Sequence, residues 1–209
     1  MEEIERLVND YLQGRNSPKL EVGRSASAKP GWLTFDLAPR EPGILGVDVR
    51  NRLPAPDCSF QFVFCEHMIE HVTFKEGLQF LRECHRILMP GGIIRVVTPS
   101  LGFLLRVTLP DRTLVEDAYL RWSIQTFVPE AGTPTPAFFV NNFMRNWGHS
   151  FIYDRKTLSG ALGAAGFRVV IECGILESEW DDLRGLEDVG RLPPGFLALE
   201  SMVFEARKM

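Results

Sequence analysis

Apolar runs separated by polar breaks are clearest along residues 60–99. Residues 60–65 form an apolar run of strand length, and residues 91–99 form a second one after a Pro-Gly-Gly break. Between the two runs, Thr73 and Glu76 have the spacing of a helix capping box, and leucines recur near one helical face. Two buried strands joined by a helix predict a βαβ crossover in a parallel sheet, with ligands beyond the carboxyl ends of the strands.

The rest of the chain continues this pattern of helices and strands. Helical periodicity predicts a helix that ends at Gly14, another over residues 114–127, and a third that begins after Asp154. Short apolar runs predict further strands over residues 19–23, 31–36, 44–49, 167–173 and 197–206. Frequent Pro, Gly and Asn over residues 129–149 predict a loop-rich segment with its own aromatic packing. The segment of residues 177–190 is rich in Asp and Glu and is expected at the surface.

Length and charge narrow the class of protein. The chain has 209 residues, enough for one domain, and a formal net charge of -4 without a cluster of Lys or Arg. We therefore expect no nucleic-acid partner, and the apolar runs are shorter than the roughly 20 residues of a membrane helix. Four cysteines without C-x-x-C spacing predict reduced, mostly buried thiols in a cytoplasmic protein.

Three predicted strands end at residues with the chemistry to hold a nucleoside. Gly23 would let the backbone approach a ligand closely, and Asp36 could accept both hydroxyls of a ribose. Asp48 or its neighbours end the third strand. The spacing from Gly23 to Asp36 is shorter than the roughly 20 positions of a dinucleotide fingerprint, so a turn glycine and a strand-end cap remain alternatives.

Several sequence blocks carry a resemblance to a known family. Residues 68–72 (MIEHV) resemble its "LEHV" segment, and residues 82–92 (RECHRILMPGG) resemble its "REIxRVLKPGG" helix and turn. Together with Gly23, residues 31–37 and residues 53–60, they look like class I S-adenosylmethionine-dependent methyltransferases of the small type 11 group. The resemblance covers about residues 19–100 well and 147–174 more loosely.

The family resemblance implies the fold class. We expect an α/β protein with a doubly wound, mostly parallel sheet of about seven strands and an antiparallel last strand. It would form a single domain over residues 1–209, with a cofactor half at about residues 15–100 and an acceptor or lid segment at about residues 101–154.

The resemblance also implies which residues bind S-adenosylmethionine, or S-adenosylhomocysteine as the product. Gly23 would abut the methionine part, Asp36 would hold the ribose hydroxyls, and Leu37 would lie against the adenine. Asp48 and Val49 would flank the adenine edge.

The floor of this site would be lined by Cys65, Glu66 and His67, after the fourth strand. This sequence departs from the glycine-rich turn of the family, because Ser25 stands where a second glycine is expected. Ser25 or Arg24 could instead bind the methionyl carboxylate.

The expected function is transfer of a methyl group to a small-molecule or sugar-type acceptor. His149 and His67 are candidate general bases and Tyr153 is a candidate positioning hydroxyl, although a structural role is the more common one for each of them. Residues 138–154 mix aromatic and polar side chains and are expected to form the acceptor side of the pocket. The alternative is a non-catalytic methyltransferase-like module that binds a partner. A homodimer is left open.

Residues 67–71 also match H-x-x-E-H, the inverted zinc-peptidase motif. That motif needs the middle of a helix, whereas these residues lie between a strand and the Thr73 cap. We therefore expect Glu70 and His71 to anchor a turn, and we expect no metal site.

Overall fold

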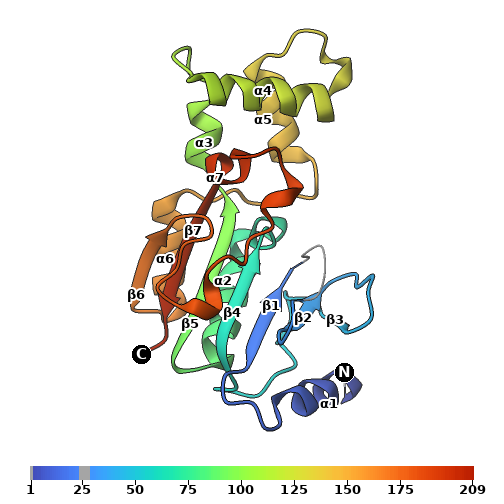
Figure 1. The fold of residues 1–209 in the computed structure, drawn as a ribbon, viewed down its shortest axis with the longest axis vertical. Coiled ribbons are helices and arrows are strands. Elements are labelled where there is room, and N and C mark those ends of the chain that lie inside the picture. The colour runs from blue at the N-terminus through green and yellow to red at the C-terminus, as the bar shows by residue number, and fades with distance from the viewer. Residues whose placement is uncertain (1, 24–28) are drawn as a thin grey trace.

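The computed structural model describes residues 2–23 and 29–209. Within these residues one sheet holds seven strands in the order β3-β2-β1-β4-β5-β7-β6 (Figure 1). The strands are β1 (Lys19–Val22), β2 (Leu33–Asp36), β3 (Ile44–Gly46), β4 (Phe60–Glu66), β5 (Leu88–Pro99), β6 (Val169–Cys173) and β7 (Ser201–Arg207). β1 to β5 are parallel, and β7 runs antiparallel to both β5 and β6. The predicted fold class is confirmed.

The helices begin and end largely where their capping residues stand. They are α1 (Glu2–Leu12), α2 (Phe74–Ile87), α3 (Leu101–Arg106), α4 (Leu114–Phe127), α5 (Pro136–Arg145), α6 (Arg155–Ala165) and α7 (Phe196–Glu200). Thr73 and Glu76 form the predicted capping box of α2, and Asp154 caps α6 through the Thr157 N–H at 2.7 Å. In the described part of the chain, no helix has both the length and the hydropathy needed to span a membrane.

The two faces of the sheet are covered differently because side chains alternate along β4. Val63 and Cys65 point into a core shared with α2 and α6. Phe62 and Phe64 point to the opposite face, which is covered by residues 174–190, the strap. Leu183 of the strap is fully buried, so the expectation that this acidic segment lies wholly at the surface was wrong.

A buried arginine fastens the strap to the sheet. Arg95 of β5 is fully buried, and its guanidinium contacts Glu187 Oε1 at 2.7 Å and Glu205 Oε1 at 2.6 Å. It also donates to the carbonyl oxygens of Gly174 and Glu177 at 3.1 and 2.8 Å. These bonds satisfy a charge that would otherwise be costly to bury.

Helices α3, α4, α5 and α7 form a cap above the carboxyl ends of β4 and β5, with an aromatic core of its own (Figure 1). The cap corrects two sequence expectations. Residues 136–145 form α5 rather than loop, because Pro136 starts the helix and Phe139 and Phe143 share its buried face. Residues 196–200 form α7, so the last strand begins only at Ser201.

Candidate active site

A cavity of about 630 Å³ opens at the carboxyl ends of β1, β2, β3 and β4. We call it the strand-end cavity. It contains six of the residues expected to bind a cofactor, namely Gly23, Asp36, Leu37, Asp48, Val49 and His67. It is closed on the other side by residues from the start of α2 and by Gly148 and Ser150. The sheet thus brings together residues from four separate strand ends, as the topology of a doubly wound sheet requires.

Gly23 lies against residues 66–68, at the carboxyl end of β4. Its φ is +99°, and a Cβ placed there would lie 2.8 Å from Met68 Cβ and 3.2 Å from the Glu66 carbonyl oxygen. Both the backbone conformation and the space therefore require glycine.

We expect Gly23→Ala to lower the free energy of unfolding by about 1–3 kcal/mol, because it adds backbone strain and a collision between Cβ atoms. The melting temperature should fall by roughly 2–12 °C. Gly160→Ala is a matched control, since a Cβ at this exposed position of α6 meets nothing within 4 Å. It should raise stability by about 0.5–1 kcal/mol. Equal effects of the two substitutions would contradict the assigned strain.

The carboxylates of Asp36 and Asp48 in the strand-end cavity differ in how tightly they are held. Asp36 is half-buried, and its Oδ1 accepts the Ala38 N–H at 2.7 Å, which fixes the side chain at the end of β2. Asp48 is held by Arg50, whose guanidinium contacts both carboxylate oxygens at 2.7–3.1 Å. This hydrogen bonding lowers the pKa of Asp48. Asp36 is therefore the carboxylate better placed to accept a pair of hydroxyls, and exposed Leu37 beside it offers an apolar surface.

Cys65 and Glu66 do not line the strand-end cavity as expected. Cys65 points into the core under α2, where burial raises the pKa of its thiol well above the usual value. The Glu66 carboxylate turns towards the strap and accepts the Asp188 N–H at 3.2 Å, so only its backbone borders Gly23. Arg24 and Ser25 lie outside the described residues.

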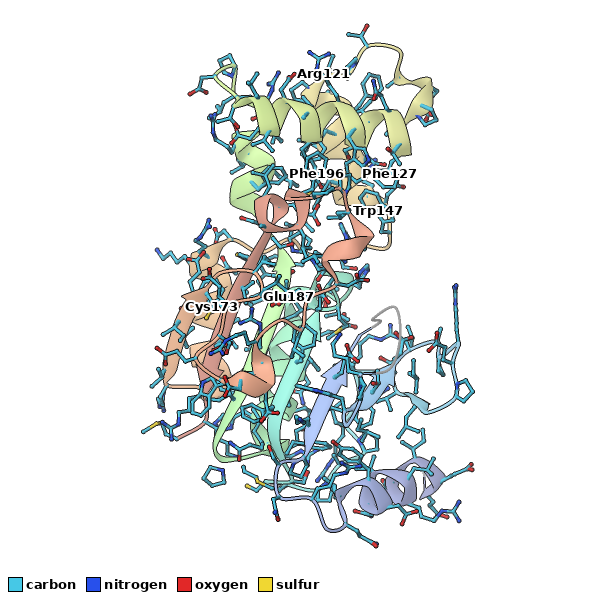
Figure 2. The ribbon with its side chains drawn as sticks, viewed as in Figure 1. Arg121, Phe127, Trp147, Cys173, Glu187 and Phe196 are labelled. Carbon is cyan, nitrogen blue, oxygen red and sulfur yellow. The ribbon has the colours of Figure 1, made fainter. Side chains whose placement is uncertain are left out.

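A second cavity, of about 260 Å³, lies between the strand ends and the cap. We call it the aromatic cavity because five Phe, Tyr and Trp rings line it. Those rings belong to Tyr119, Trp122, Phe127, Phe143 and Trp147. Figure 2 shows Phe127 and Trp147 together on the side of the cap that faces the sheet, and their ring centroids are 4.9 Å apart. His67 and His71 line both cavities, so the two spaces meet at these side chains.

A buried carboxylate lies at this junction. Glu70 is fully buried, its Oε2 accepts the Thr98 hydroxyl at 3.1 Å, and His67 Nδ1 lies 3.1 Å from its Oε1. Burial alone would raise the pKa of Glu70, but the His67 contact and the nearby His71 hold it below the ordinary value. Glu70 is therefore ionised at neutral pH.

His149 presents one free ring nitrogen to the aromatic cavity. Its Nδ1 lies 2.6 Å from the Phe143 carbonyl oxygen, and a carbonyl can only accept, so Nδ1 carries the proton. Burial lowers the pKa of His149, which makes the imidazole neutral at pH 7. The unprotonated Nε2 is then competent to take a proton, as a general base must.

Tyr153 does not fit the expected positioning role. Its ring is fully buried and stacks edge-on against Phe151, and it lines neither cavity. Burial raises the pKa of its hydroxyl to about 12. The residue is a core aromatic beneath α2, because the strand-like segment after Ser150 alternates and directs this side chain inward.

The zinc-peptidase arrangement is not formed. His67 follows β4 with a φ of +46°, and residues 69–71 form a single 3-10 turn, so His67 and His71 share no helix face. Glu70, His71 and His149 do place one donor atom each within 4.8 Å of one another. Since the Glu70 oxygens already contact Thr98 and His67, the absence of a metal site stays our prediction.

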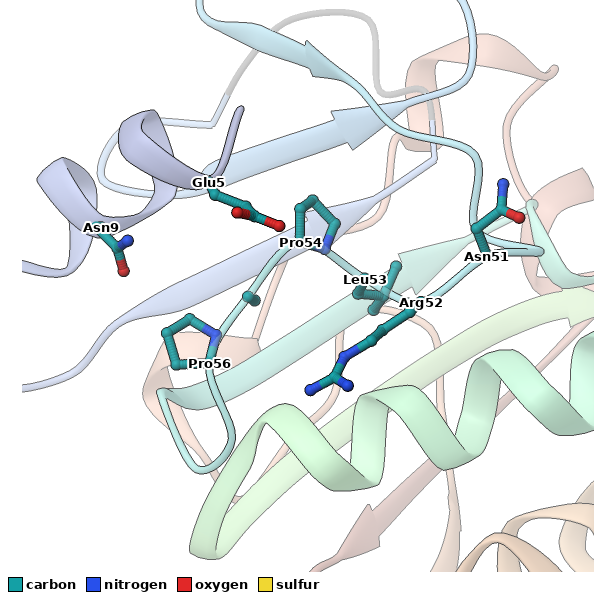
Figure 3. A pocket seen from close by; sticks show the side chains of 8 residues that line it. Glu5, Asn9, Asn51, Arg52, Leu53, Pro54 and Pro56 are labelled. Carbon is teal, nitrogen blue, oxygen red and sulfur yellow. The ribbon is translucent and has the colours of Figure 1, made fainter. Parts of the chain in front are cut away.

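A further cavity, of about 550 Å³, lies between α1 and residues 51–56 (Figure 3). Its side chains include Glu5, Asn9 and Arg52, and Pro54 and Pro56 form part of its wall. None of these residues follows the carboxyl end of a strand, and none belongs to the histidine cluster. We therefore treat the two joined cavities as the candidate site.

The sequence did not reveal several residues of these cavities. The aromatic cavity includes Arg191 and Glu200, whereas Thr73 and Glu76 line the strand-end cavity. Glu200 reaches the site because β7 begins opposite the end of β5, where Ser201 pairs with Pro99. That pairing joins residues about a hundred positions apart and leaves no local signal. The capping box at Thr73 was recognised, but only as a helix start.

Comparison with known proteins agrees with this geometry. Residues 24–96 match the family model described as "Methyltransferase domain", type 11. The chain is 34% identical over 100 residues to "Probable methyltransferase PMT21" of Arabidopsis thaliana, which covers 41% of this chain and 16% of that protein. It is 41% identical over 58 residues to a "Probable S-adenosylmethionine-dependent methyltransferase" of Mycolicibacterium smegmatis, covering 26% of this chain and 22% of the relative. The matches thus span less than a quarter of these relatives.

The fold comparison extends over the whole chain. A crystal structure of a SAM-dependent methyltransferase from Archaeoglobus fulgidus aligns with 99% of this chain and 94% of its own, with a TM-score of 0.54 and 13% identity. At that identity the likeness concerns the fold. Fold and family match lead to one conclusion: residues 24–96 are similar to the type 11 methyltransferase domain, and the chain as a whole has the fold of S-adenosylmethionine-dependent methyltransferases.

Proposed function

We propose that this protein transfers the methyl group of S-adenosylmethionine to a small-molecule acceptor bound in the aromatic cavity. The observation that carries the proposal is the junction of the two cavities at His67 and His71. A ligand in each cavity would meet there. Methyl transfer needs such an in-line approach, since orientation supplies much of the acceleration.

The strand-end cavity has the features that a nucleoside cofactor requires. Gly23 leaves room for close backbone approach, Asp36 offers carboxylate oxygens, and Leu37 offers an apolar surface for a base. Bound S-adenosylmethionine would supply an electrophilic methyl group. The residues of the chain would orient it and exclude water.

The aromatic cavity would hold the acceptor, and His149 would remove its proton. Phe143, Trp147 and His149 come from the segment that the sequence assigned to the acceptor side. Phe138 of that segment is instead partly exposed outside this cavity, and Phe139 belongs to the cap core.

Asp36→Ala tests the cofactor part of the proposal. We expect binding of S-adenosylhomocysteine to weaken about 10- to 150-fold, the loss of one hydrogen bond to a charged group. Isothermal calorimetry measures this, with the melting temperature as a check on folding. Asp10→Ala, an exposed change on α1, is the matched control and should leave the affinity unchanged.

Calorimetry can also reject the proposal. If the unmodified protein gives no heat and no thermal shift with millimolar S-adenosylhomocysteine, the chain is a non-catalytic module of the same fold. If Asp36→Ala and Asp10→Ala lose the same affinity for S-adenosylhomocysteine, Asp36 does not contact the ligand.

A further inference from the structure

The walls of the aromatic cavity contain the ring types that bind cations. Trp122 and Phe127 lie 5.5 Å apart and Phe127 and Trp147 lie 4.9 Å apart, each pair edge to face, so neighbouring ring planes are steeply inclined. Figure 2 shows Phe127 and Trp147 under α4, facing the sheet. The faces of such rings carry negative potential and attract cations, most strongly where water is excluded.

The charged groups of the cavity favour the same kind of ligand. Glu70 is ionised and fully buried at one side. Glu200, whose pKa is raised by burial, accepts a hydrogen bond from the Tyr119 hydroxyl. Arg191 is the cationic group of the lining, and its guanidinium lies 3.5 Å from Glu200. The lining thus holds the carboxyl groups of Glu70 and Glu200 beside the guanidinium of Arg191, and the buried Glu70 carboxylate would attract a cation.

Trp147 is also held in an uncommon conformation. Its φ is +58°, although it is a bulky residue, and nearly half of its side chain is exposed. The following residues, Gly148 and His149, turn back so that the imidazole lies beside the indole, with ring centroids 5.6 Å apart. Strain of this kind persists where the surroundings require a particular placement. Here it places one aromatic wall next to the free Nε2 of His149.

Building on the proposed function, we infer that the methyl acceptor is a small primary or secondary amine, bound as its ammonium ion. The aromatic walls and Glu70 recognise the charge. His149 Nε2 then takes one proton, which leaves a nitrogen lone pair to attack the methyl group. A carbon–nitrogen bond forms as the carbon–sulfur bond breaks, S-adenosylhomocysteine leaves, and the His149 proton passes to solvent.

Other acceptor classes fit these groups less well. A carboxylate acceptor would be repelled by Glu70, and it needs no general base. A phenol would use His149 in the same way, but neutral phenol gains little from the buried carboxylate. The preference for a cation therefore separates an amine from both.

The test compares two probes of the same shape. Choline carries a quaternary nitrogen where 3,3-dimethyl-1-butanol has a carbon atom, so only charge distinguishes them. Calorimetric titration in the presence of S-adenosylhomocysteine should show choline binding at millimolar concentrations, roughly tenfold or more tighter than the alcohol. Trp147→Leu keeps an apolar side chain but removes the π face, and should erase this preference.

Trp180→Leu is the matched control, because it removes the same ring on the strap, where Trp180 packs against Phe62. It should keep the choline preference. Equal affinity for the two probes, no choline binding, or tighter binding of phenol than of choline would each overturn the amine assignment. S-adenosylhomocysteine binding is measured in the same samples, so failure of the amine assignment is distinct from failure of the proposed function.

Discussion

Replacing His149 with alanine should reduce methyl transfer about 100-fold or more while leaving cofactor affinity and melting temperature nearly unchanged, as for loss of a general base. The reason is the neutral imidazole, whose Nδ1 is fixed by the Phe143 carbonyl and whose Nε2 is free. Turnover would be measured as S-adenosylhomocysteine formed with an acceptor selected from a panel of amines and phenols.

The pH dependence of the methyl-transfer rate is an independent test of His149 as the general base. A general base must be unprotonated, so the rate should fall as pH drops through the pKa of His149. Burial lowers that pKa below the ordinary histidine value of 6.5. The acidic limb should therefore lie below pH 6.5, and it should be absent from His149→Ala.

His85→Ala is the matched control for His149. His85 lies on α2 and packs edge-on against Phe167, outside both cavities. Its loss should leave the methyl-transfer rate unchanged. If His149→Ala instead lowers the melting temperature in proportion to the activity lost, His149 is only a structural residue of the cap.

Replacing Arg95 with methionine should destabilise the fold by about 3–5 kcal/mol, since it leaves the buried carboxylates of Glu187 and Glu205 without their cation. The melting temperature should fall by roughly 6–20 °C. Figure 2 places Glu187 over the sheet, so the strap should detach first and expose Phe62 and Phe64. Faster amide hydrogen exchange along residues 174–190 would report this detachment.

Arg184→Met is the comparison within the same strap. Arg184 pairs with Asp181 at 2.8 Å, and both side chains are largely exposed. An exposed pair of this kind contributes at most about 1 kcal/mol. A loss of stability in Arg184→Met as large as in Arg95→Met would contradict the role assigned to the buried arginine.

Local sequence signals predicted the elements whose causes are local. The Thr73–Glu76 capping box, the Asp154 cap and the apolar runs of β1, β4 and β5 all appear in the structure. Their determinants are hydrogen bonds and side-chain periodicity within a few residues, which a single sequence displays directly. The helix α5 was not predicted, because its proline and asparagines are typical of a loop, whereas its buried face is stabilised only by packing within the cap.

The side-chain environment of the site was decided by tertiary structure. The sequence alone identified Gly23, Asp36 and His149 as functional candidates. It could not show that β4 turns Cys65 into the core and Glu66 towards the strap, because that depends on which face of the sheet each neighbour covers. The capping box at Thr73, the helix cap at Asp154 and the glycine after β1 were therefore determined by the sequence itself, whereas β3 ends at Gly46 and β7 begins only at Ser201. The joining of two cavities at His67 and His71 was decided only by packing between segments far apart in the chain.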